Sequence, residues 1–171
     1  MRLVRVLVCT TIVSAAVTES PLVSWASAQE AIYIVRHAER VDDARDSVLS
    51  ADGWARAARL ADMLRDAGVT TIFATTYQRT IDTARPLASR LGLQVQSVAP
   101  DDTPDLITKV RAAGPQSRVL IVGHSDTVPA ILKALGYATE VVIAKGEFDN
   151  LFLVLPGDKP GAPPMVLRLR Y

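Results

Sequence analysis

Short apolar runs alternate with helical patterns along most of this 171-residue chain, and this rhythm limits what it can fold into. We expect strands at 31–35, 70–75, 93–98, 118–123, 150–155 and 165–170. The first run, AIYIV, is continuously apolar and the fourth, RVLIVG, is nearly so, which is typical of strands that helices cover on both faces. The sequence therefore predicts an α/β fold: a three-layer α/β/α sandwich with a mostly parallel central sheet.

Helical patterns fill the gaps between these strands. The first helix is expected to begin after Ser50 and to stop at Gly68, with its apolar residues facing the core. Those residues are Trp54, Ala57, Leu60, Ala61 and Leu64. The second helix begins near Gln78, is disturbed at Pro86 and ends at Gly92. Two shorter helices follow in the second half of the chain.

The first 28 residues differ in kind from the rest. They hold two arginines, then an apolar run at 6–17, then an A-x-A site that ends at Ala28. We expect a signal peptide at 1–28 that is cleaved after Ala28 and leaves a single domain at 29–171. The alternative is a retained membrane anchor, but about 12 mostly apolar residues are fewer than the roughly 20 that a spanning helix needs. The expected location is periplasmic or secreted, with no membrane span after cleavage.

The composition places the chain among ordinary globular proteins. It has 49% hydrophobic and 22% charged residues and a formal net charge of +1. This balance gives no sign of a polyanionic partner, so we expect no nucleic acid to bind. The sequence does not specify an oligomeric state.

Both histidines of the chain fall at expected strand ends, each near an arginine or a helix start. The first strand delivers Arg36 and His37, the second leads to Arg79, and the fourth presents His124 and Ser125. Because the carboxyl ends of parallel strands share one edge of a sheet, and ligands gather at that edge, these side chains should lie close together.

This set of residue types suits phosphoryl transfer. Forked guanidinium groups match a phosphate dianion in charge and geometry. A neutral imidazole, here that of His37, can attack phosphorus and form a phosphohistidine. The two arginines and His124 would hold the oxygens, and backbone N–H groups of the helices that start beyond Thr76 and Ser125 could join them.

Four segments of the sequence also resemble, in the same order, the motifs of the histidine phosphatase superfamily, which has the phosphoglycerate mutase-like fold. They are VRHAE at 35–39, LSADGWARA at 49–57, TTYQRTIDTA at 75–84 and VGHSDTVPAIL at 122–132. The resemblance runs from Ala31 to about Leu155. It implies that His37 is the phosphoacceptor, that Arg36, Arg79 and His124 form the phosphate pocket, and that no cofactor or metal is needed.

The residue that protonates the leaving oxygen departs from the family's pattern. Longer relatives supply an acid from a middle insertion or directly after the second histidine, whereas here the middle segment is short and Ser125 follows His124. The candidates are Glu39, Asp42, Asp43 and Asp126. Glu39 has the best placement, two residues past the nucleophile, although it could instead orient Arg36.

A weak acid favours substrates whose leaving group needs little protonation, such as acyl phosphates, pyrophosphates or phosphohistidine. The signal peptide argues against phosphorelay proteins as substrates, because these are cytoplasmic, and favours a small phosphorylated compound such as an envelope sugar. The sequence thus predicts an exported phosphatase that hydrolyses a phosphate monoester or anhydride.

Two other functions remain open. One is a non-catalytic module that binds a phosphate ligand in the same pocket. The other is a metallohydrolase using His37, Glu39 and His124, for which the spacing gives thin support.

Overall fold

The computed structural model describes residues 29–157, 159 and 161–171. The signal peptide predicted at 1–28 lies outside these residues and stays a prediction. In chain order the elements are β1 (Ala31–Arg36), α1 (Ala51–Leu64), β2 (Thr71–Thr75), α2 (Gln78–Leu91), β3 (Val95–Val98), α3 (Thr103–Ala112), β4 (Arg118–Gly123), α4 (Thr127–Ala134), β5 (Asn150–Leu155) and β6 (Met165–Arg170). All six strands lie where the apolar runs predict them, with ends that differ by at most two residues.

The strands form one mixed sheet in the order β3-β2-β4-β1-β5-β6. Neighbouring strands from β3 to β1 are parallel, whereas β5 runs antiparallel to β1 and β6 antiparallel to β5. The α/β prediction is confirmed, but the sheet is less uniformly parallel than expected. The reason lies in the connections, because a parallel neighbour needs a crossover across the sheet. The chain enters β5 at the end of the sheet where β1 finishes, since Leu151 pairs with Val35, and the next strand in the chain, β6, pairs antiparallel with β5.

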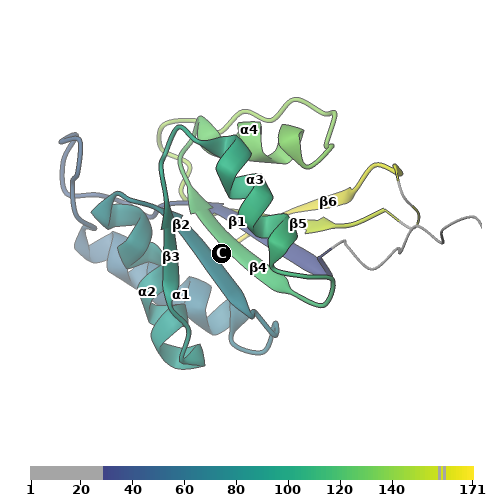
Figure 1. Cartoon of the computed structure of the whole chain (residues 1–171). Coiled ribbons are helices and arrows are strands. Elements are labelled where there is room, and N and C mark those ends of the chain that lie inside the picture. Colours follow the sequence, from purple (N-terminus) through teal and green to yellow (C-terminus); the bar gives the residue numbers. More distant parts are fainter. Residues whose placement is uncertain (1–28, 158, 160) are drawn as a thin grey trace, which may run out of the picture.

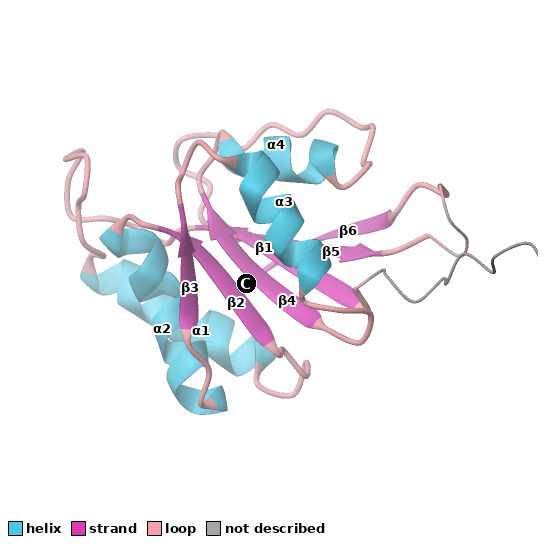
Figure 2. Ribbon diagram, viewed as in Figure 1, coloured by secondary structure: helices cyan, strands magenta, loops and turns pink. Residues whose placement is uncertain are grey.

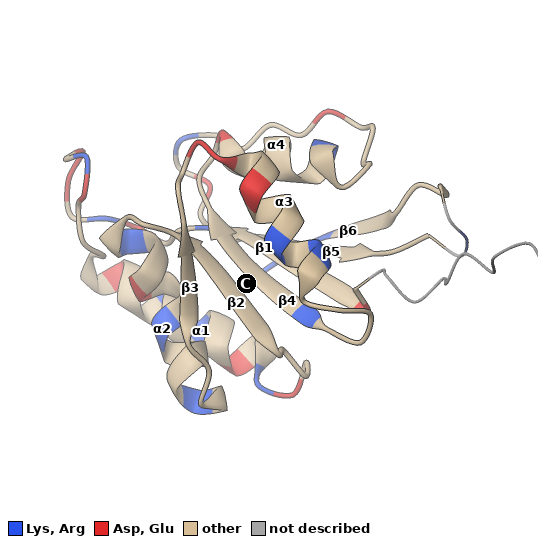
Figure 3. Cartoon of the chain, in the orientation of Figure 1, with Lys and Arg blue, Asp and Glu red and all other residues tan. Residues whose placement is uncertain are grey.

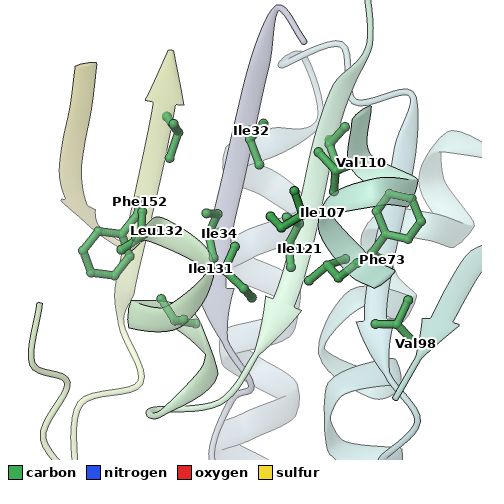
Figure 4. Close-up of a cluster of buried hydrophobic side chains, with 14 of the residues drawn as sticks. Ile32, Ile34, Phe73, Val98, Ile107, Val110, Ile121, Ile131, Leu132 and Phe152 are labelled. Atoms are coloured by element: carbon green, nitrogen blue, oxygen red, sulfur yellow. The ribbon is translucent and has the colours of Figure 1, made fainter. Parts of the chain in front are cut away.

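Helices cover both faces of the sheet, as Figures 1 and 2 show, with α1 and α2 behind it and α3 and α4 in front. The front cluster includes Phe73 from β2, Ile107 from α3 and Ile131 from α4 (Figure 4). The rear cluster includes Leu60 from α1 and Leu87 from α2. Burial on both faces explains why β1 and β4 are almost entirely apolar.

Helix α1 follows the predicted pattern with one exception. The Ser50 side chain accepts a hydrogen bond from the Gly53 N–H and caps the helix. Gly53, Ala57, Leu60, Ala61 and Leu64 are buried, whereas Trp54 is 40% exposed. The prediction that Trp54 faces the core is wrong, because the buried positions lie three or four residues apart and Trp54 lies on the flank of that stripe.

The close packing of α1 requires a glycine at position 53. A Cβ atom there would lie 2.1 Å from the carbonyl oxygen of Glu39, in the segment that follows β1. This approach lets α1 lie directly against the end of β1. None of the helices in the described part of the chain combines the length and the apolar character needed to cross a bilayer.

Candidate active site

His37 follows β1 and is held by backbone contacts on both sides. Its N–H donates to the Gly123 carbonyl of β4 at 2.9 Å, and the next N–H, of Ala38, donates to Thr83 Oγ1 of α2 at 2.9 Å. The ring atom Nδ1 lies 2.8 Å from the Ala38 carbonyl oxygen. Because a carbonyl only accepts, Nδ1 carries the proton, and the neutral ring keeps its lone pair on Nε2. This is the tautomer that a nucleophile attacking through Nε2 needs.

The environment of His37 keeps its ring neutral. Burial is the main cause, and together with the charges of His124, Arg79 and Arg36 it lowers the pKa to about 3, against the opposing hydrogen bond to Ala38. At neutral pH the lone pair is therefore available. No hydrogen bond of the described residues engages Nε2, and this atom is not among the buried polar atoms that lack a partner, so it is accessible from the cavity.

Arg36 is anchored by a turn of the segment before β5. Its Nη1 donates to the carbonyl oxygens of Ala144, Lys145 and Glu147 at 3.0, 2.9 and 3.1 Å. The guanidinium carbon lies 4.1 Å from the centre of the Phe148 ring. The Nε atom is buried and has no hydrogen-bond partner. These contacts fix the Arg36 guanidinium group at the edge of the sheet and leave its buried Nε–H without an acceptor among the described residues.

Arg79 of α2 is held in a similar way from the other side. Its Nη1 donates to the Arg45 carbonyl at 2.7 Å, and its guanidinium carbon lies 4.4 Å from the centre of the Tyr77 ring. Its Nε is also buried without a partner. Burying an unpaired donor costs roughly 1–3 kcal/mol, so the fold holds both guanidinium groups beside the cavity at an energetic cost.

His124 follows β4 and lies beside His37. The two ring centres are 5.3 Å apart at an interplanar angle of 61°, and the Tyr77 ring packs against His124 at 5.4 Å. Nε2 of His124 lies 2.9 Å from Thr75 Oγ1 at the end of β2. Burial, followed by the positive charge of Arg79, lowers the pKa of His124 to about 4. Both imidazoles are therefore neutral in the empty site.

These residues line one cavity of about 700 Å³ at the carboxyl ends of the parallel strands. Arg36, His37, Arg79, His124 and Ser125, all named from the sequence, are among its lining residues. Sequence reasoning missed six others, which are Arg40, Arg45, Tyr77, Pro100, Asp101 and Thr127. All but Thr127, which begins α4, lie in the loops beyond the strand ends, where charges of both signs gather (Figure 3). Nothing in the sequence pattern marks them, because loop residues carry no periodicity that predicts their direction.

Positive charge dominates the inner part of this cavity. Burial is the largest cause that lowers the pKa of Arg36, and the positive charges of Arg40 and Arg79 follow. Arg79 shows the same order, burial first and then Arg40. Three guanidinium groups that disfavour each other's charge form a site that an anion would stabilise.

Glu39 does not lie in this cavity. Its carboxylate accepts from Arg56 Nε at 2.9 Å and from Arg56 Nη2 at 2.6 Å. Partial burial is the largest single influence on Glu39 and raises its pKa, but the hydrogen bonds from Arg56, a backbone hydrogen bond and the charges of Arg56 and Arg59 together hold the pKa below the usual range. A carboxyl group that is ionised and turned toward Arg56 is poorly suited to protonate a leaving group, so the placement favours a structural role over the acid role that was preferred from sequence.

The other acid candidates divide in the same way. Asp42 and Asp43 do not line the cavity, and Asp43 pairs with Arg40. Asp126 does line it, is exposed, and accepts a hydrogen bond from the Thr127 N–H at 2.9 Å. Asp101 is a second exposed carboxyl at the cavity, one that was not considered from sequence.

The helix starts contribute less than expected. The N–H of Gln78, at the start of α2, donates to Asp46 Oδ1 at 2.7 Å, and the Thr127 N–H of α4 is taken by Asp126. Carboxylates thus already occupy two of the helix-start donors that were expected to bind phosphate. Among the described residues, no three His, Cys, Asp or Glu side chains lie together as a potential metal site, and Glu39 does not join the two histidines.

The comparisons with known proteins agree with this geometry. The model of the histidine phosphatase superfamily (branch 1) matches residues 32–99, which hold three of the four motifs in whole or in part. No curated protein sequence matches the chain.

Solved structures with low sequence identity share the fold. A mycobacterial hydrolase is 15% identical with a TM-score of 0.65, and the match covers 83% of this chain and 98% of that one. The protein histidine phosphatase SixA in complex with tungstate is 13% identical with a TM-score of 0.64, covering 82% and 96%. The mycobacterial glucosyl-3-phosphoglycerate phosphatase is 15% identical with a TM-score of 0.60, covering 73% and 89%.

The order of the motifs, the family model matched over residues 32–99 and the shared fold agree with one another: the chain is similar to the histidine phosphatase superfamily.

Proposed function

We propose that this protein is a phosphatase that works through a phosphohistidine on His37. The observation that carries the proposal is the convergence of the Arg36 and Arg79 side chains on two neutral imidazoles in one cavity. A tetrahedral oxyanion offers the acceptors that such a set of donors binds. Similarity to the superfamily supports phosphatase activity in general.

The proposed reaction has two displacements. In the first, the lone pair on His37 Nε2 forms a bond to phosphorus while the bond from phosphorus to the leaving oxygen breaks. The leaving oxygen takes that electron pair and a proton. In the second, water attacks the phosphohistidine, releases inorganic phosphate and restores neutral His37. Arg36, Arg79 and His124 bind the three remaining oxygens in both displacements. Donors held in a fixed geometry stabilise the charge that develops on these oxygens in the transition state.

The source of the leaving-group proton limits the substrate. Of the four acids considered from sequence, only Asp126 lines the cavity, and it is exposed to water. We assign it the role of acid. Because both carboxyl groups that line the cavity, those of Asp101 and Asp126, are exposed to water, the protein should act best on small phosphorylated substrates with good leaving groups.

The first test is hydrolysis of an activated aryl phosphate by the full chain, with and without a chelator, beside His37→Ala. We expect chelator-resistant turnover that the variant lacks, and an acid-labile, base-stable phosphoryl adduct when the wild type is quenched during turnover. Binding of phosphate without any turnover would favour the non-catalytic binding module. Loss of turnover in the chelator would favour the metallohydrolase.

We further propose that the protein is exported. The support is the sequence of 1–28 alone: basic residues, an apolar run and the A-x-A site ending at Ala28. Cell fractionation with N-terminal sequencing tests this. A mature protein that begins at Gln29 outside the inner membrane is expected, and an uncleaved chain in the membrane fraction would favour a retained anchor.

A further inference from the structure

Two threonine hydroxyls stand between His124 and the backbone, and neither is part of the reaction proposed above. Nε2 of His124 lies 2.9 Å from Thr75 Oγ1, which lies 2.8 Å from Thr80 Oγ1. Thr80 Oγ1 in turn contacts the Thr75 carbonyl at 2.9 Å and the Tyr77 carbonyl at 2.6 Å. Both threonines and the histidine are buried.

The direction of this hydrogen-bond chain follows from its far end. Two oxygens 2.6 Å apart need a proton between them, and a carbonyl only accepts, so the single hydroxyl proton of Thr80 points at the Tyr77 carbonyl. Thr80 Oγ1 can then only accept from Thr75, which uses up the hydroxyl proton of Thr75. Thr75 Oγ1 can therefore only accept from His124, and Nε2 of His124 must carry a proton.

This assignment leaves the other ring nitrogen facing the cavity without a proton. No hydrogen bond of the described residues engages Nδ1 of His124, and Nδ1 is not among the buried atoms that lack a partner. It is therefore reachable from the cavity that His124 lines. A neutral His124 offers an acceptor there, although an oxyanion needs a donor.

We infer that Thr75 and Thr80 are positioning residues that fix the proton of His124 on Nε2, so that an oxyanion binds together with one proton taken up on Nδ1. Only the imidazolium has a donor at both nitrogens, one for Thr75 and one for the anion. The inference rests on the anion pocket proposed above, but the state of the ring can be measured without any catalysis.

The charges around His124 set when this proton is taken up. Arg79, Arg36 and Arg40 disfavour a cation in the empty pocket, Asp126 favours one, and the uncharged rings of His37 and Tyr77 pack against it. A bound dianion offsets the three arginines and reverses the balance. Proton uptake should therefore accompany binding and should not precede it.

The primary test is the nitrogen NMR spectrum of the imidazoles in the full chain. The chain has two histidines, so only two ring systems appear, and His37→Ala assigns them. We expect opposite neutral tautomers: Nδ1–H for His37 and Nε2–H for His124. In Thr75→Val, which removes the acceptor but keeps the shape, His124 should shift toward Nδ1–H, and Thr75→Ser should restore Nε2–H.

The second test uses sulfate, a dianion that carries no proton of its own at neutral pH. In the wild type, bound sulfate should convert His124 to the imidazolium, and the affinity should fall about tenfold per pH unit as pH rises, as uptake of one proton requires. In Thr75→Val the neutral ring already has its donor on Nδ1, so affinity should depend less steeply on pH.

A wild-type His124 with Nδ1–H in the free protein would overturn the inference, even if Thr75→Val failed to fold. So would a neutral His124 in the sulfate complex, or equal pH slopes in wild type and Thr75→Val. If sulfate does not bind, the anion pocket itself is wrong and proton uptake falls with it, while the tautomers still decide the role of the hydroxyls. Absence of phosphatase activity with the expected tautomers would refute the proposed function alone.

Discussion

The ion pair between Glu39 and Arg56 separates a structural from a catalytic role for the residue two places after the proposed nucleophile. Arg56 donates three hydrogen bonds to the Glu39 carboxylate and a fourth from Nη1 to the Tyr171 carbonyl at 2.9 Å. Glu39 therefore links the segment after β1 to Arg56 of α1, and through Arg56 to Tyr171, which follows β6. Glu39→Ala removes this link.

The expected cost comes from hydrogen bonds between charged groups, which contribute roughly 1.5–3 kcal/mol when formed. The Glu39 and Arg56 side chains retain 23% and 16% of their exposure, so solvent screens part of this interaction. We expect Glu39→Ala to lower the free energy of unfolding by about 2 kcal/mol, which corresponds to a fall in Tm of about 7 °C for a domain of this size.

Urea unfolding of the two single variants, Glu39→Ala and Arg56→Ala, and of the double variant measures the coupling directly. The exposed Glu140 provides a matched control, since Glu140→Ala should leave stability unchanged. Turnover of an activated aryl phosphate by Glu39→Ala should fall by less than about tenfold. Additive single effects, or a large loss of turnover on poor leaving groups at unchanged stability, would refute this reasoning and restore Glu39 as the acid.

Three further outcomes are expected. Because burial lowers the pKa of His37 to about 3, protonation of this ring should not reduce kcat/KM between neutral pH and about 5, and an acid limit should appear only below that; the stability that neutral His37 contributes is complete above its unfolded pKa and is lost as pH falls toward 3. An acid limit near pH 6.5 would contradict the burial. Gly53→Ala places a Cβ 2.1 Å from the Glu39 carbonyl oxygen and should cost about 2 kcal/mol or more in thermal unfolding, whereas Gly146→Ala, with nothing within 4 Å, should be near neutral. Arg79→Lys keeps the charge but loses Nε and the fork, so kcat/KM should fall by about 10- to 100-fold; equal activity would show that charge alone suffices.

The sequence predicted the strands well because each is a short run whose burial on both faces leaves a local, continuous apolar signal. The mixed character of the sheet was not predicted, because whether β5 joins parallel or antiparallel depends on where the preceding chain leaves α4. Trp54 was misplaced for a related reason: helical spacing identifies a stripe, but the width of that stripe is set by the helix packed against it.

At the site, the adjacency of strand ends brought Arg36, His37, Arg79 and His124 together as expected, since parallel strands share an edge. The role of Glu39 could not be judged from its position, because its partner Arg56 lies on α1, seventeen residues away. Thr75 and Thr80 lie within the third motif, but nothing in the sequence distinguishes them, since threonine is ordinary both at a strand end and in the first turn of a helix.

By itself, the sequence determined the fold class and the residue types that gather at one edge of the sheet. The hydrophobic periodicity of each element, and the polar residues that follow each strand, are local properties carried by consecutive residues. Tertiary structure alone decided the hydrogen-bond partners at the site: the carbonyls that anchor Arg36, the tautomers of the two histidines and the pairing of Glu39 with Arg56. These depend on hydrogen-bond partners from distant segments, and a hydrogen bond is fixed by tenths of an ångström that no sequence pattern encodes.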